Sequence, residues 1–173
     1  MVPKDSALAI TVFTEDTLDL ILEKRGSGSW VVNPTKAGRC KYLVCCRKES
    51  WKNRNEGAEA RAAFLIGLVA GLQKWPGSEN ERGQPRFLIE ISHYARLDEP
   101  NVWNGRMRNP VAYLPLEKLG IDLKGIKFEP LPAAPELRAV AASKGKMSIA
   151  EAKKALAASF GVTPEDVEII IRG

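Results

Sequence analysis

Short apolar runs alternate with polar breaks in the first third of the chain. Residues 8–13 are rich in strand-forming side chains. Thr14 follows them, and Glu15 and Asp16 supply the acidic first turn expected of a capped helix. Apolar residues then recur at helical spacing until Gly26, a residue typical of a helix end. The pattern predicts a strand followed by a short helix.

The next segments predict a turn and two strands. Residues 26–29, Gly-Ser-Gly-Ser, are typical of a flexible turn, and residues 30–32 predict a short strand that Asn33 and Pro34 end. Residues 39–48 alternate in the manner of a strand. One predicted face carries Cys40, Tyr42, Val44 and Cys46, and the other carries Lys41, Leu43, Cys45 and Arg47.

The middle of the chain predicts a hairpin. Residues 58–63 have a helical pattern, but Gly67 and Gly71 weaken a helix and favour a bent strand from Phe64 onward. Residues 76–85 are polar, and residues 86–96 form the strongest strand pattern of the chain. We therefore expect the two strands to pair across the polar segment.

Loops and a separate tail make up the rest. Residues 98–109 predict a long loop, residues 116–119 a short helix, and the Pro- and Ala-rich segment that follows a linker. Ser148 and Glu151 predict a capping box for a helix that Gly161 ends. The apolar face of that helix contains Ile149, Ala152, Leu156 and Phe160. Residues 167–172 predict a closing strand.

Composition limits the class of protein. The chain has 173 residues, 45% of them hydrophobic, which suits one domain with an appendage. The longest apolar stretch, residues 62–72, is much shorter than the ~20 residues of a membrane-spanning helix, and the chain start lacks a signal-peptide pattern. Three closely spaced cysteines make a poor disulfide framework. We expect a soluble, cytoplasmic protein with no membrane contact.

Positive charge gathers in one stretch. The net charge is +5, and residues 36–61 contain eight basic and three acidic side chains, which accounts for the whole excess. Such a stretch is either a solvated surface or a face that meets phosphates. The candidate phosphate contacts in it are Lys36, Arg39, Lys41, Arg47, Lys48, Lys52 and Arg54.

Three tryptophans have basic or amide neighbours along the chain. Trp30 precedes Asn33, Trp51 lies among lysines and arginines, and Trp103 precedes Arg106, Arg108 and Asn109. An aromatic face can stack on a base while cations meet phosphate and an amide reads a base edge. The alternative is that each tryptophan packs a loop onto the core, which we favour for Trp30. Both alternatives stay open for Trp103.

Catalytic and metal motifs are weak. The single histidine, His93, has no nucleophile elbow or carboxylate at a spacing typical of a triad. Cys45 and Cys46 would point to opposite faces of a strand and could not easily share a metal. We predict buried structural cysteines, no metal and no cofactor.

The order of elements resembles the PUA-like superfamily, particularly its EVE, ASCH and YTH branches. The resemblance covers roughly residues 7–120 and rests on strand-helix-strand at 8–32, the basic strand at 40–48, the glycine-containing run at 64–71, and Asn-Pro-Val-Ala-Tyr-Leu-Pro-Leu-Glu-Lys-Leu at 109–119. It implies a small bent barrel that binds RNA or modified bases in a pocket at the barrel mouth. The pocket residues it implies are Trp30, Asn33, Ser92, His93, Tyr94, Trp103 and Asn109.

These patterns together predict an α+β fold, a small bent mixed β-barrel of PUA-like type with peripheral short helices. Residues 1–130 would form the domain, 131–147 a linker, and 148–173 a helix-strand appendage whose strand could join two copies as a homodimer. The leading function is a non-enzymatic nucleic-acid-binding module. The alternatives are a protein-interaction factor that binds an acidic partner, such as an inhibitor or antitoxin-like regulator, and a metal-dependent nuclease or base-modifying enzyme that uses His93 with acids near Asp98.

Overall fold

A mixed β-sheet dominates the first of the two compact units into which the chain divides, residues 1–132 and 133–173. The computed structural model describes residues 7–75, 79–105, 107–132 and 149–170. The strands of the sheet are β1 (Leu8–Thr14), β2 (Gly26–Trp30), β3 (Tyr42–Arg47), β4 (Ala63–Lys74), β5 (Phe87–Glu99), β6 (Val111–Pro115) and β7 (Glu129–Pro130). The short helices of this unit are α1 (Leu18–Lys24), α2 (Pro34–Ala37) and η1 (Leu116–Leu119).

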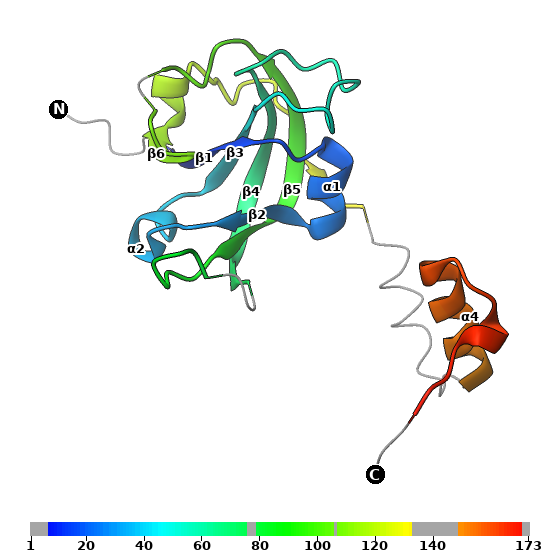
Figure 1. Cartoon of the computed structure of the whole chain (residues 1–173). Coiled ribbons are helices and arrows are strands. Elements are labelled where there is room, and N and C mark those ends of the chain that lie inside the picture. The colour runs from blue at the N-terminus through cyan, green and yellow to red at the C-terminus, as the bar shows by residue number, and fades with distance from the viewer. Residues whose placement is uncertain (1–6, 76–78, 106, 133–148, 171–173) are drawn as a thin grey trace. The chain divides into compact units, whose positions relative to one another are not determined.

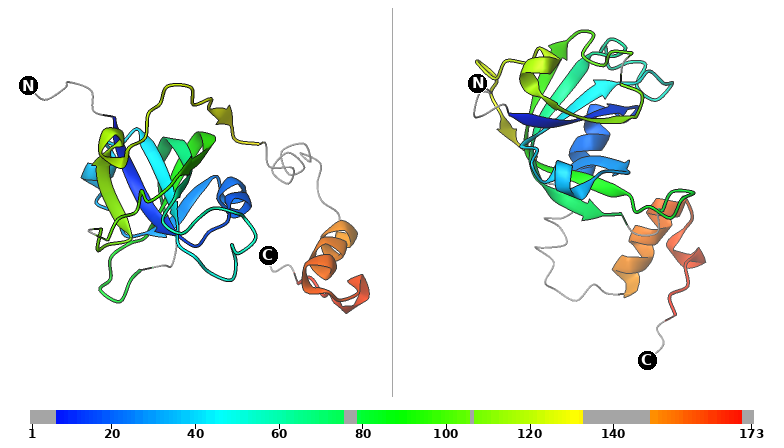
Figure 2. Two further views of the ribbon diagram at one scale, coloured as in Figure 1. Left: turned by 90° about the horizontal axis from the view of Figure 1, so that it is seen from above. Right: turned by 90° about the vertical axis from the view of Figure 1, so that its left-hand side faces the viewer.

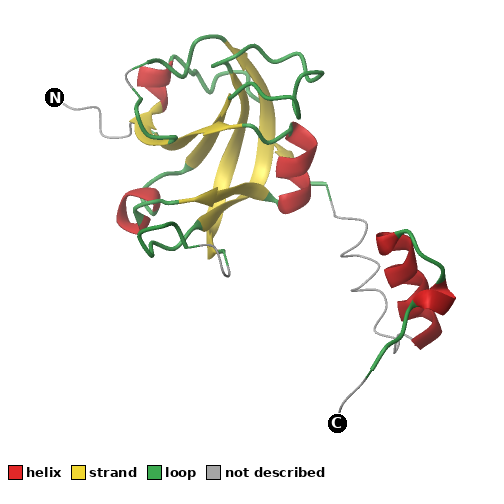
Figure 3. Cartoon of the chain, viewed as in Figure 1, coloured by secondary structure: helices red, strands yellow, loops and turns green. Residues whose placement is uncertain are grey.

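The described strands are ordered β2-β5-β4-β3-β1-β6, and β7 pairs with β5. Figures 1 and 2 show this sheet curling into a half-barrel with the short helices beside it. The prediction of a small, bent, mixed α+β barrel is confirmed at this level. Figure 3 shows how strand predominates in the first unit.

β1 lies between β3 and the edge strand β6. It pairs in parallel with β3, where Ile10 is opposite Leu43, and antiparallel with β6. Parallel neighbours need a long crossover, and residues 15–41 supply it with α1, β2 and α2. Apolar clusters cover both faces of β1 and β3, with Leu43 and Cys45 in one cluster and Val44 and Cys46 in the other. The predicted alternation is therefore confirmed for residues 42–46, although both faces of the strand are buried. It is wrong for Cys40, which precedes the strand and packs in the cluster of Leu43 and Cys45.

The predicted hairpin is confirmed by the antiparallel pair β4 and β5. Gly67 of β4 leaves room for the Ile91 side chain of β5, because a Cβ at position 67 would lie 2.7 Å from Cγ2 of Ile91. Register shifts follow between Leu68 and Gly71, and such bulges bend a strand. The two long strands can therefore carry the curvature of the half-barrel.

Residues 26–29 were predicted as a flexible turn, and that prediction is wrong. They form most of β2, which pairs with β5 and ends at Trp30. Gly26 allows the backbones of β2 and β5 to approach closely, because a Cβ at this position would lie only 2.1 Å from the carbonyl oxygen of Ile89. A Gly-Ser composition resembles a turn, whereas the neighbouring strand decides that the segment is extended.

Two helix predictions are also corrected. α1 begins after Thr17, whose side chain accepts a hydrogen bond from Leu20 N at 3.2 Å, rather than after Thr14. The left-handed residue that ends α1 is Arg25, one position before Gly26. Residues 58–63 form no helix, because the segment turns back to pair with β3 as β4 begins.

The predicted linker starts later than its proline content indicates. Glu129 and Pro130 pair with Tyr94 and His93 of β5, and Leu131 is buried in the core. The first unit accordingly runs to Pro132. Residues 133–147 of the predicted linker lie outside the described residues.

The described part of the second unit contains α4 (Ile149–Phe160) and the single turn η2 (Pro164–Asp166). Gly161 ends α4 with φ +67°, as predicted, and Thr163 and Asp166 form a capping box around η2. Residues 167–170 are irregular rather than a strand, since no described strand of this unit pairs with them. Ser148, the side chain of Glu151 and residues 171–173 lie outside the described part of the chain. Neither α4 nor any other described helix is long and apolar enough to cross a membrane.

Candidate functional site

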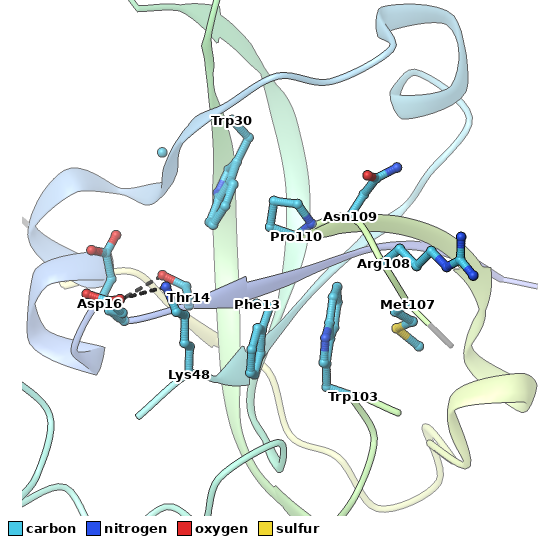
Figure 4. Close-up of a pocket in the computed structure, with 12 residues that line it drawn as sticks. Phe13, Thr14, Asp16, Trp30, Lys48, Trp103, Met107, Arg108, Asn109 and Pro110 are labelled. Atoms are coloured by element: carbon cyan, nitrogen blue, oxygen red, sulfur yellow. Dashed lines mark hydrogen bonds and ion pairs between the residues drawn. The ribbon is translucent and has the colours of Figure 1, made fainter. Parts of the chain in front are cut away.

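A hollow of about 520 Å³ opens where the end of β1 meets β2 and the loop before β6 (Figure 4). Four segments that are separate in the sequence supply its walls. The lining residues are Phe13, Thr14, Glu15, Asp16, Gly28, Trp30, Lys48, Trp103, Met107, Arg108, Asn109 and Pro110. The hollow combines aromatic, acidic and basic side chains, so it can receive a flat polar ligand.

Aromatic rings form two of its sides. Phe13 and Trp103 stack with centroids 5.0 Å apart and planes 4° apart, and Trp103 is only 6% exposed. Trp30 lies on the other side of the hollow, and its indole N–H donates to Ser27 Oγ at 2.9 Å (Figure 4). Backbone bonds hold both residues of the stacked pair, because Phe13 N donates to Pro110 O and Trp103 N donates to Arg61 O. The rings are therefore held in place before any ligand arrives.

Charged side chains line the hollow beside the rings. Lys48 Nζ lies 2.8 Å from Glu15 Oε1, and this lysine lowers the pKa of Glu15 below its usual value. Asp16 pairs with Lys24 at 3.5 Å, and its backbone N donates to Thr14 Oγ1. Arg108 and Asn109 are exposed at the edge. A ligand would meet carboxylates near β1 and a guanidinium on the loop side.

Arg47 was predicted to contact phosphate, and the structure contradicts this. Its side chain is buried, with Nη1 donating to Asp16 O at 2.9 Å and Nη2 paired with Glu56. The guanidinium also lies 3.8 Å from the centre of the Phe64 ring. Glu56 uses its other oxygen to accept from Leu18 N at the start of α1. Arg47 therefore joins β3 to the turn after β1, and its side chain is only 2% exposed.

Asn53 is a structural residue that the sequence interpretation missed. Its side-chain amide donates to Glu15 O at 3.0 Å and to Lys48 O at 2.8 Å, while its oxygen accepts from Ser50 N. These bonds hold the 48–57 loop against the turn that carries Glu15. A buried asparagine in a polar loop gives no sequence signal, because its partners are backbone groups.

The predicted basic face is divided between the two ends of β3. Lys36, Arg39 and Lys41 are exposed before the strand, and Lys52 and Arg54 are exposed after it. The strand itself separates the groups by roughly 17 Å. Trp51 is 77% exposed in the second group, with Lys52 Nζ 6.0 Å from its ring. One continuous basic patch does not form.

Most of the pocket residues that the resemblance implies lie elsewhere. Of that set, only Trp30, Trp103 and Asn109 line the hollow. Asn33 caps α2 by accepting from Lys36 N, and its own N–H donates to the Tyr113 hydroxyl. Arg106 lies outside the described residues.

The β5 candidates lie away from the hollow. Ser92 Oγ is 3.0 Å from His93 Nδ1, and His93 is opposite Pro130 of β7. Tyr94 packs against the core. Asp98 follows five positions later on the same strand, roughly 17 Å from His93 in an extended chain. The structure therefore separates the two residues that the nuclease alternative would combine.

The cysteines are buried and unpaired with one another. Burial raises the pKa of Cys40, and raises that of Cys46 to about 12. Cys45 and Cys46 belong to opposite faces of β3, as predicted. Within the described residues, no three His, Cys, Asp or Glu side chains are grouped to hold a metal ion.

The lining residues that the sequence interpretation missed are Phe13, Thr14, Glu15, Asp16, Gly28, Met107 and Pro110. The turn from strand to helix at residues 14–17 was the one available signal, because such turns leave polar groups at a sheet edge. Comparison of this chain with models of protein families, with curated proteins and with solved structures gives no match.

Proposed function

We propose that this chain is a nucleic-acid-binding module that holds a base in the hollow between Trp30 and the Phe13–Trp103 pair. The observation that carries the proposal is the arrangement of preset aromatic rings around one hollow with the exposed Arg108 at its side. Aromatic faces stack on any base, and cations beside them attract the backbone phosphates. The curled mixed sheet is consistent with the PUA-like resemblance, which implies a base pocket at the barrel mouth.

The test is binding of the purified, nuclease-treated protein to labelled single- and double-stranded DNA and RNA across a salt series. Affinity should fall as salt rises, because phosphate contacts release counterions. Stacking contributes about 1–3 kcal/mol per base, so Trp30→Ala should weaken binding by roughly 5- to 150-fold. Trp30→Phe should recover much of the loss, since it keeps a flat ring.

Trp51→Ala is the matched control, because Trp51 is exposed and is not among the residues that line this hollow. Trp103→Ala is a poor test, since its ring is buried against Phe13 and its loss would disturb the fold. Absence of binding to all four nucleic acids at low salt, or equal losses in the Trp30 and Trp51 variants, would refute the proposal.

A protein-interaction role is a second candidate, and the second unit favours it. Large apolar side chains of this unit are exposed, including Phe160 at 74%, Ile149 and Ile170. Exposed apolar groups of this kind are typical of contact surfaces. A stoichiometric partner, or a second copy of the chain, should survive nuclease treatment and be lost in Phe160→Ser but not in Trp30→Ala. Light scattering after size exclusion distinguishes a second copy from another protein.

A further inference from the structure

A second hollow of about 730 Å³ adjoins the first. Met107, Arg108 and Asn109 line both hollows, so this short segment forms the wall between them. The far side of the second hollow is β6, which includes Tyr113, and η1, which includes Lys118. β6 is an edge strand of the described sheet, so the hollow opens at the margin of the half-barrel.

The charge of the second hollow differs from that of the first. Its charged lining residues are Arg108 and Lys118, with no carboxylate among the lining residues. Lys36 is not a lining residue, but its Nζ lies 5.9 Å from the centre of the Tyr113 ring. The first hollow contains Glu15 and Asp16. Anionic groups are therefore favoured in the second hollow.

The side chain of Tyr113 is held in place near these basic residues. Its hydroxyl accepts a hydrogen bond from Asn33 N at 2.8 Å, which ties β6 to the start of α2. The residue is half-buried, packs against the core cluster that includes Ile10 and Val12, and also lines the second hollow. A held aromatic side chain beside cations is a combination that binds a base with its phosphates.

We infer that the second hollow binds the nucleotide adjacent to the one in the first hollow, so the ligand is a single strand that crosses the Met107–Asn109 wall. The inference rests on the proposed function. Adjacent bases are joined through one phosphate, and Arg108 is the cation common to both hollows. A base-paired duplex keeps neighbouring bases stacked and could not place them on opposite sides of a wall.

The test compares a mononucleotide with a single-stranded trinucleotide, using the full chain and quenching of tryptophan fluorescence. We expect the trinucleotide to bind the unmodified protein at least about tenfold more tightly, because it adds a stacked base. Lys118→Glu should remove most of that advantage and lower the salt slope by about 1, with mononucleotide affinity changed by less than about twofold.

Lys124→Glu is the control, because Lys124 is exposed like Lys118 but lines neither hollow. If Lys124→Glu weakened trinucleotide binding as much as Lys118→Glu, the effect would come from the net charge of the protein. That result would overturn the inference. A mononucleotide that binds as tightly as the trinucleotide would also overturn it, while leaving the proposed base pocket intact. If neither ligand binds, the proposed function fails first.

A strand of another protein added to the edge of β6 is the competing occupant. Tyr113→Leu distinguishes the two, since it removes the ring and keeps the backbone edge. Loss of the trinucleotide advantage in this variant supports the nucleotide, and an unchanged advantage overturns its placement on Tyr113. Thermal unfolding of each variant confirms that the sheet is retained.

Discussion

The two ends of β3 carry basic residues from the same stretch of sequence, yet the structure uses them in opposite ways. At the end of the strand, Arg47 is buried against Glu56 and Lys48 pairs with Glu15, whereas Lys52 and Arg54 in the loop beyond are exposed. Before the strand, Lys36, Arg39 and Lys41 are exposed, with no ion pair to a carboxylate among the described residues. The two ends differ because the carboxylates of Glu56 and Glu15 lie within ion-pair distance of Arg47 and Lys48. A basic side chain is available to a ligand only where the fold brings no acid to it.

Of the substitutions that test this contrast, removal of the buried Arg47 guanidinium should have the largest effect on stability. Arg47→Ala leaves Glu56 without its partner and removes the contact with Phe64. Because the Glu56 side chain keeps 24% exposure, we expect a loss of about 2–4 kcal/mol in the free energy of unfolding, somewhat below that of a fully buried pair.

Urea unfolding measures this loss, and Arg39→Ala is the matched control at the other end. Arg39 is exposed, so its replacement should change stability by less than about 0.5 kcal/mol. Similar losses in the two variants would show that the ends of β3 do not differ in the way described.

The neutral amide beside the buried pair should have the next largest effect. Asn53→Ala removes three hydrogen bonds and leaves the backbone carbonyls of Glu15 and Lys48 without this donor. We expect a loss of about 2 kcal/mol, measured by the same unfolding experiment. Asn55→Ala in the same loop is exposed and should be nearly neutral. An equally small change in Asn53→Ala would mean that water replaces these bonds.

The exposed pair at this end should have the smallest effect, and it depends on pH. Lys48 lowers the pKa of Glu15 through a hydrogen bond and through charge, so the pair favours the folded state above the ordinary value of 4.5. Its contribution is lost as the pH falls through the lowered pKa. NMR titration should find the Glu15 pKa raised toward its ordinary value in Lys48→Ala. A Glu15 titration that does not move in this variant would contradict the pairing.

The local pattern of the sequence predicted much of the secondary structure. β1, β5 and the β4–β5 hairpin follow from period-two alternation and strand-forming residues, and both are properties of neighbouring positions. The two faces of β3 and the helix end at Gly161 were predictable for the same reason. The failures at residues 26–29 and 167–170 are equally instructive, because a segment becomes a strand only when another strand pairs with it.

The candidate site was decided by the tertiary structure. Trp30 and Trp103 were predictable as aromatic side chains near cations, but the stacking of Phe13 on Trp103 joins positions 90 residues apart in the chain. The burial of Arg47 likewise depends on Glu56 and on the turn after β1. The sequence by itself determined where strands and caps can form, since backbone conformation follows local preference. Which side chains line a hollow and which charges are neutralised depends on non-local packing, so only the folded chain decided them.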